Sequence, residues 1–147
     1  MMSPTDVLLM VQAVASGAMC GIIWFVQVVH YPLFAWSGGD ERRFAEENQR
    51  RTGGVVIPFM LAEGATAGLF AWMPPAGVPQ TAAVVGVVIV AMLWLSTAMV
   101  QMPLHARLSR EGHAPEIVTS LVRSNWVRTL LWTLRAVLAA WMLRAAA

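Results

Sequence analysis

The sequence predicts an all-α integral membrane protein, an antiparallel bundle of four membrane-spanning helices. Apolar residues make up 58% of the 147 residues and charged residues only 12%, with a mean hydropathy of +0.62. Soluble domains are about half apolar and a quarter charged. The apolar residues also gather in four stretches, and four spans of roughly 20 residues with short loops suit a single domain of this length.

The first span is predicted at about residues 7–36, and the turn Gly38-Gly39-Asp40 ends it. Because this is long for one crossing, we expect the helix to kink or to emerge into the membrane interface near Tyr31-Pro32. The following loop, residues 40–51, repeats Glu and Arg at helical neighbour spacing. It therefore predicts a short interfacial helix in loop 1.

The other three spans are predicted at about residues 55–73, 80–102 and 126–143. An uncharged turn rich in proline separates the second span from the third, and Pro103 indicates the end of the third. The polar connector 105–125 forms loop 3 and includes His113, which we expect to be solvated. Ile117, Val118 and Leu121 have an amphipathic spacing, so a second interfacial helix is expected here.

The distribution of arginine predicts the orientation of the bundle. Loops 1 and 3 lie on one side and are rich in Arg, whereas the turn between the second and third spans carries no charge. The positive-inside rule places these two loops in the cytoplasm and both termini outside, for a multi-pass protein of the bacterial inner membrane. The pI near 9.5 does not indicate nucleic-acid binding, because the arginines lie beside acids or next to spans.

Polar residues at membrane depth indicate a functional site, because an ionisable side chain in hydrocarbon is costly unless it is partnered. Counting about 1.5 Å per residue from the predicted cytoplasmic ends, Glu63 and Arg135 both lie roughly 12–14 Å deep. They are therefore expected to form an ion pair at the floor of a polar funnel that opens to the cytoplasm. The residues predicted to form this site come from all four spans: Gln27, His30, Glu63, Gln101, His105, Asn125, Arg128 and Arg135.

These residue types allow more than one chemistry. His30, His105 and Glu63 supply the ligand set of a mononuclear iron or copper site, with zinc as a third choice. The two histidines, on different helices, could instead ligate haem from both sides. Without a metal, a histidine flanked by Arg and Gln could take a proton from a flat phenolic substrate and stabilise its anion. Asn125 and Arg128 would then orient an anionic or quinone-like substrate.

Each candidate also has a purely structural interpretation. The pair Glu63–Arg135 could fix the register of the helices, with Glu63 serving as its carboxylate rather than as a third ligand. His30 and His105 could be ordinary interfacial histidines. Arg128 could extend along the helix to place its charge at the interface.

Three segments carry a family resemblance: Trp24 to Phe34, Pro58 to Glu63, and Ser124 to Thr129. They resemble a group of small bacterial membrane proteins with four helices, and most of the chain is distantly similar to the anthrone-oxygenase-like family. That family shares four spans and an Asn-x-x-Arg element entering the last one, which corresponds here to Asn125 and Arg128. The resemblance implies oxygenation of a hydroxylated aromatic.

A second resemblance lies in Trp24-Phe25 and the following Tyr31-Pro32-Leu33-Phe34. This pattern is similar to the four-helix membrane protoporphyrinogen oxidase family, in which a first-helix histidine helps to bind haem. The resemblance implies haem as an alternative cofactor. The chain has no lysine, so the lysine of that family's haem site has no counterpart here.

We therefore predict a small membrane oxidoreductase or oxygenase acting on a hydrophobic aromatic or quinone-like molecule. The alternatives are a carrier or channel for protons, a metal ion or a small anion, a haem-binding subunit, or a structural subunit of a larger membrane complex. The small-residue pairs Gly17/Gly21 and Gly64/Gly68 suit close packing within the chain or in a homo-oligomer. Loop 1, with Glu46 and Glu47, could fold over the funnel as a lid.

Overall fold

The computed structural model describes residues 2–36, 38–112 and 114–147, so the prediction for His113 lies outside the described residues. Four stretches, Pro4–Trp36, Glu41–Trp72, Gln80–Glu111 and Pro115–Ala145, are long and apolar enough to cross a membrane. The described residues contain no β-strand, which confirms the all-helical class. In chain order the α-helices are α1 (Pro4–Phe25), α2 (Tyr31–Leu33), α3 (Glu41–Trp72), α4 (Gln80–Ser96), α5 (Met102–Glu111) and α6 (Pro115–Ala145).

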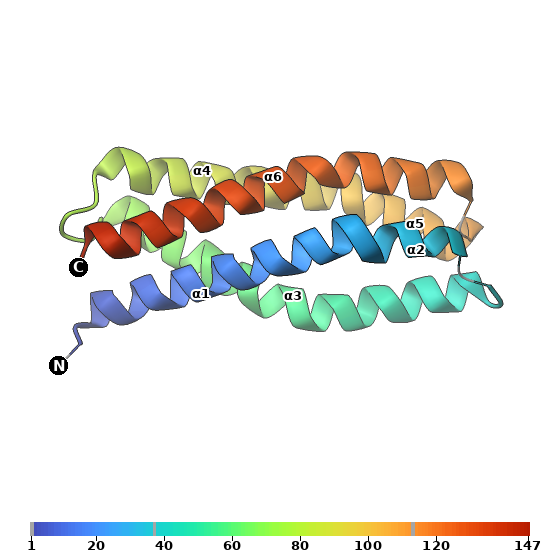
Figure 1. The fold of residues 1–147 in the computed structure, drawn as a ribbon, viewed down its shortest axis with the longest axis horizontal. Helices are drawn as coiled ribbons and strands as arrows, with labels where there is room; N and C mark the ends of the chain where they lie inside the picture. Colours follow the sequence, from blue (N-terminus) through green and yellow to red (C-terminus); the bar gives the residue numbers. More distant parts are fainter. Residues whose placement is uncertain (1, 37, 113) are drawn as a thin grey trace.

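The long helices lie side by side along one axis, and the two chain termini are at the same end of the molecule (Figure 1). Helix α1 packs against α3 and α6, and α4 packs against the same two helices. A capping box begins α1: the Ser3 amide donates to Asp6 Oδ2 at 2.8 Å, and the Asp6 amide donates to Ser3 Oγ at 3.2 Å. Asp40 caps α3 by accepting from the Arg43 amide at 3.1 Å.

The loop segments predicted as separate interfacial helices are continuous with the long helices. The charged segment 41–51 forms the first turns of α3, and the connector of loop 3 is divided between the end of α5 and the start of α6. Two adjacent glycines, at 53 and 54, are typical of a break in a helix. A helix nevertheless tolerates glycine at a modest cost when its neighbours pack. Helix α3 therefore begins before residue 55, where the second span is predicted to start.

Two helices widen into π-helical turns, Val26–His30 and Thr97–Gln101. The Tyr31 amide bonds to the Val26 carbonyl, and the Met102 amide bonds to the Thr97 carbonyl. A proline follows each turn, at 32 and at 103; its ring clashes with the carbonyl four residues earlier, which favours this wider spacing. The helix therefore continues past Pro103 instead of ending there. Such π turns are rare and often occur at functional sites.

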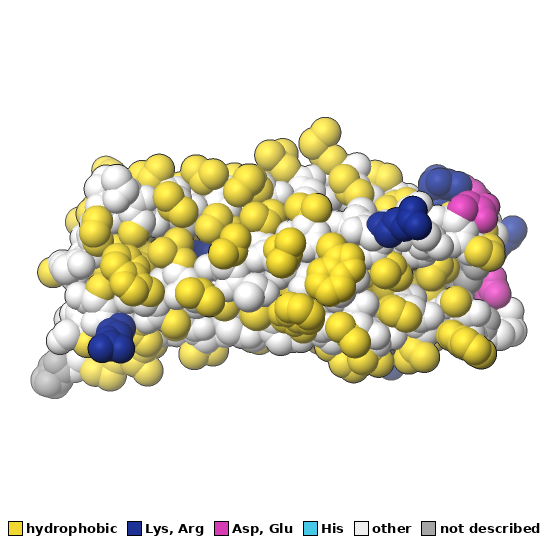
Figure 2. Space-filling view, turned by 45° about the horizontal axis from the view of Figure 1, so that its top comes forward, with side chains coloured by type: hydrophobic (Ala, Val, Ile, Leu, Met, Phe, Trp, Pro, Cys, Tyr) yellow, Lys and Arg dark blue, Asp and Glu magenta, His cyan; other side chains and the backbone are white. Residues whose placement is uncertain are grey.

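The core consists of two apolar clusters, and the outer surface is largely apolar too. One cluster includes Met19, Ile23, Leu93 and Trp132, and the other includes Leu9, Phe70 and Met142. Figure 2 shows hydrophobic side chains over most of one face, with charged side chains mainly at the end opposite the termini. An apolar flank of this kind suits contact with lipid acyl chains.

The predicted small-residue pairs behave differently from one another. A Cβ at Gly64 would lie 2.8 Å from Cζ2 of Trp94, so this glycine allows close packing of α3 on α4 within the chain. A Cβ at Gly17 or Gly21 would meet no atom within 4 Å. Among the described residues nothing lies within 4 Å of a Cβ at Gly68 either, so a homo-oligomer through the Gly17/Gly21 or the Gly64/Gly68 face stays a prediction.

A glycine in the turn between α3 and α4 should be required for stability. Gly77 has a φ of +79°, and a Cβ there would collide with the backbone carbonyl of Ala145 at the end of α6. We expect Gly77→Ala to lower the free energy of unfolding by more than about 1–2 kcal/mol, the cost of the left-handed backbone alone. The measurement is unfolding by sodium dodecyl sulfate from mild detergent micelles.

The matched control is Gly21→Ala, where a Cβ meets no neighbour and alanine favours the helix by about 0.5–1 kcal/mol. Equal stabilities for the two variants would contradict this role of Gly77.

Candidate functional site

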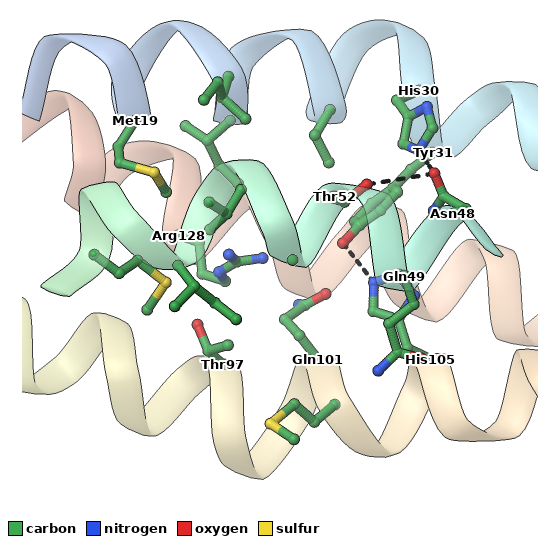
Figure 3. Close-up of a pocket in the computed structure, with 18 residues that line it drawn as sticks. Met19, His30, Tyr31, Asn48, Gln49, Thr52, Thr97, Gln101, His105 and Arg128 are labelled. Atoms are coloured by element: carbon green, nitrogen blue, oxygen red, sulfur yellow. Dashed lines mark hydrogen bonds between the residues drawn. The ribbon is translucent and has the colours of Figure 1, made fainter. Parts of the chain in front are cut away.

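A cavity of about 290 Å³ lies between the first, second and third spans at the end of the bundle that holds loops 1 and 3. Its walls are mainly apolar side chains such as Met19, Ile23, Val56 and Met60. Both π-helical turns reach it, the first through Val26 and His30 and the second through Thr97 and Gln101 (Figure 3). Of the predicted site residues, this cavity brings together His30, Gln101, His105 and Arg128.

A tyrosine and a histidine form a hydrogen bond at the cavity wall. The Tyr31 hydroxyl and His105 Nε2 lie 2.9 Å apart, and Tyr31 is only 4% exposed. Tyr31 follows the first π turn directly, so the widened turn and Pro32 set the direction in which its ring points. The bond therefore joins the first span to α5 across the cavity (Figure 3). A phenol bonded to an imidazole is a pair through which a proton can move.

The second histidine of the cavity has a different partner. His30 Nε2 lies 2.9 Å from Oδ1 of Asn48, in the first half of α3. The Thr52 hydroxyl donates to the same oxygen at 3.4 Å. These bonds connect the first π turn to the charged half of α3, which therefore forms a wall of the cavity. The predicted lid residues, Glu46 and Glu47, do not line the cavity, and Glu47 pairs with Arg50 and Arg51.

A buried polar chain holds Arg128 in place. Gln27 Oε1 accepts from Asn125 Nδ2 at 2.9 Å and from the Thr129 hydroxyl at 3.3 Å, while Gln27 Nε2 donates to the Val122 carbonyl at 3.1 Å. Asn125 Oδ1 in turn accepts from Arg128 Nη1 at 3.1 Å. Gln27 and Asn125 do not line the cavity, and their hydrogen bonds connect Arg128 to the first π turn.

Gln101 and Arg128 present the polar groups of the deeper wall. Gln101 Nε2 donates to the Ser124 hydroxyl at 3.0 Å, which ties the second π turn to α6. Arg128 is 7% exposed and lies beside the Tyr31 hydroxyl. Its Nε is buried and has no hydrogen-bond partner among the described residues. The cavity therefore combines apolar walls with a buried guanidinium and a phenol–imidazole pair.

Glu63 and Arg135 form the predicted ion pair, but outside the cavity. Arg135 Nε donates to Glu63 Oε2 at 2.8 Å, and both side chains are 0% exposed. The Ser16 hydroxyl donates to the other carboxylate oxygen. A Cβ at Gly86 would lie 3.1 Å from Arg135 Nη1, so this glycine makes room for the guanidinium. Together with Ser16, the pair links the first, second and fourth spans, which fits a structural role.

The described residues do not fit the predicted three-ligand metal site. No three His, Cys, Asp or Glu side chains come together among the residues described in the structure. Glu63 is held by Ser16 and Arg135, and the two histidines bond to Asn48 and Tyr31 instead. A site built from His30 and His105 alone, with haem or with iron or copper, stays a prediction.

Sequence reasoning missed Tyr31 and Asn48 as site residues. Tyr31 belongs to the Tyr31-Pro32 step that predicts a kink, and it is the only tyrosine in the chain. A lone polar aromatic at a proline step inside a span was therefore an available signal. Asn48 lies within the charged segment of loop 1, where nothing in the residue pattern sets it apart from its solvated neighbours.

The chain matches no protein-family model, no curated protein and no solved structure.

Removing only the carboxylate of the buried pair should destabilise the chain strongly. Glu63→Met leaves the Arg135 charge buried without a partner, and we expect a loss of about 3–5 kcal/mol in the free energy of unfolding. The double variant Glu63→Met/Arg135→Met removes both charges, and we expect it to recover most of that loss. Unfolding by sodium dodecyl sulfate from mild micelles measures both. A double variant no more stable than the single one would contradict a self-contained pair.

Proposed function

We propose that the chain is a small membrane oxidoreductase or oxygenase that acts on a hydrophobic aromatic or quinone-like molecule. The observation that carries this proposal is the hydrogen bond between Tyr31 and His105 Nε2, at 2.9 Å, on the wall of an apolar cavity. Ligand pockets typically combine apolar walls with a few placed polar groups, and proton-transfer sites add a titratable pair. The distant resemblance to the anthrone-oxygenase-like family supports the same reaction class.

The apolar lining favours a hydrophobic substrate. Ile57 and Met102 line the cavity and are also 55% exposed on the outer surface. The cavity wall between α3 and α5 thus reaches the face that lipid would cover, so a substrate dissolved in the bilayer can enter from the side. A volume of about 290 Å³ suits a molecule of two or three fused rings.

The polar groups suggest how the chemistry begins. A substrate hydroxyl placed at Tyr31 gives its proton to the Tyr31 oxygen while the Tyr31 proton moves to His105 Nε2. Arg128, oriented by Asn125, stabilises the oxyanion that remains. The electron-rich anion is then the form that dioxygen oxidises. These proton-transfer steps use only residues that line the cavity or that contact a lining residue.

The proposed setting is an antiparallel four-span bundle in the bacterial inner membrane. Loops 1 and 3 would face the cytoplasm, because arginine gathers on that side, and the cavity lies at the same end. The carrier alternative receives less support, since its proposed gate, Glu63–Arg135, is fully buried and does not line the cavity. Elemental analysis and an optical spectrum of the purified protein test the predictions of iron, copper and haem.

The test of the proposed function uses a hydroxylated anthrone as substrate and protein in nanodiscs. We expect dioxygen consumption with formation of the corresponding quinone. His105→Gln and Tyr31→Phe should each lower kcat by about 10²- to 10⁴-fold, the usual contribution of a positioned acid or base. The control is Glu116→Gln, an exposed carboxylate in the first turn of α6. Wild-type rates in both cavity variants, or no turnover by wild type, would contradict the proposal.

A further inference from the structure

The charges buried in the bundle do not balance. Among the described residues, three charged side chains are more than nine-tenths buried: Glu63, Arg128 and Arg135. Glu63 and Arg135 neutralise each other through their 2.8 Å contact. Arg128 keeps its charge at any physiological pH, because the guanidinium does not release its proton in proteins. The interior therefore carries one uncompensated positive charge.

The described groups next to Arg128 are an amide, a phenol and an imidazole, and none of them is a carboxylate. Its Nη1 donates to the amide oxygen of Asn125 at 3.1 Å, and the Tyr31 hydroxyl lies beside it. No aspartate or glutamate is among the described residues that line the cavity. Placing a charge in a low-dielectric interior is costly unless an opposite charge accompanies it. The missing counter-charge must therefore come from outside the chain.

From these contacts we infer that the cavity binds a lipophilic organic monoanion whose charged oxygen lies against Arg128. This inference rests on the proposed function, since it names the substrate class of the same cavity: an aromatic acid or phenol that is held there in its ionised form, rather than a neutral quinone. Arg128 supplies charge-assisted hydrogen bonds to the anion, and Met19, Ile23, Val56 and Met60 contact its hydrocarbon part. A single buried charge sets the ligand charge at minus one.

The size of the cavity limits the ligand to a small one. Ligand pockets span roughly 300–1,000 Å³, and this cavity, at about 290 Å³, is at the lower end of that range. A fused pair of aromatic rings with one acidic group fits within such a volume. 2-Naphthoate and 2-naphthamide are therefore suitable probes, because they have nearly the same shape and differ in charge.

The experiment compares saturable binding of the two probes, by isothermal titration calorimetry at neutral pH, to protein in nanodiscs of zwitterionic lipid. For wild type we expect 2-naphthoate to bind about 10- to 100-fold more tightly than 2-naphthamide, the effect of a charged hydrogen-bond partner. Arg128→Lys, which keeps the charge, should retain a reduced preference. Arg128→Gln should remove the preference but still bind 2-naphthamide, which also reports that the cavity is intact.

Three results would overturn the inference: equal affinity of wild type for both probes, failure of wild type to bind either, or a preference for 2-naphthoate that survives in Arg128→Gln. The inference would also be overturned if Tyr31 were ionised and supplied the counter-charge to Arg128. Because Tyr31 is the only tyrosine, a tyrosinate band in the ultraviolet spectrum at neutral pH, absent from Tyr31→Phe, would identify it.

The inference and the proposed function can fail separately. A preference for the carboxylate without turnover of the anthrone keeps the anion site and removes the oxygenase. Turnover without a charge preference keeps the oxygenase and removes the anion site.

Discussion

The cost of burying charge in a membrane-spanning bundle is the constraint on which the rest of this structure depends. Glu63 and Arg135 offset this cost by pairing with each other. Ser16 binds the second carboxylate oxygen, and Gly86 leaves room for the guanidinium. For Arg128 this cost is offset only in part, by hydrogen bonding to a neutral amide and by a neighbouring phenol. The first arrangement fixes the relative positions of three spans. The second leaves a buried charge at a cavity with no carboxylate beside it among the described residues.

The π-helical turns that precede Pro32 and Pro103 both contribute residues to the cavity wall. The π turns before Pro32 and Pro103 each add a residue to one turn of helix, which changes the direction of every side chain that follows. Tyr31 and His105 come just after these turns and meet at 2.9 Å. Gln27, inside the first turn, reaches Asn125 and Thr129 on α6 instead. The same local distortion thus contributes to both the hydrogen bond between Tyr31 and His105 and the polar chain that holds Arg128.

The candidate site of the sequence analysis proved to be two sites. Polar residues at similar spacing on four helices predict that these residues converge on one site. Glu63 pairs with Arg135, whereas His30, Gln101, His105 and Arg128 line a separate cavity. Spacing along a helix gives the depth of a residue, but it does not give the direction of a side chain around an irregular helix axis. The three-ligand metal set therefore looked plausible on depth alone, although Glu63 is held by other partners.

By itself, the sequence determined the all-helical class, the four apolar stretches and the ion pair of Glu63 with Arg135, because these follow from hydropathy, helix length and the cost of unpaired charge. Only the tertiary structure decided that loop 1 forms the start of α3, that Tyr31 bonds His105 and that no carboxylate among the described residues lines the cavity at Arg128. The physical reason is that these features depend on π turns and on contacts between residues far apart in the chain. Local periodicity cannot encode either of them, because it assumes a regular helix.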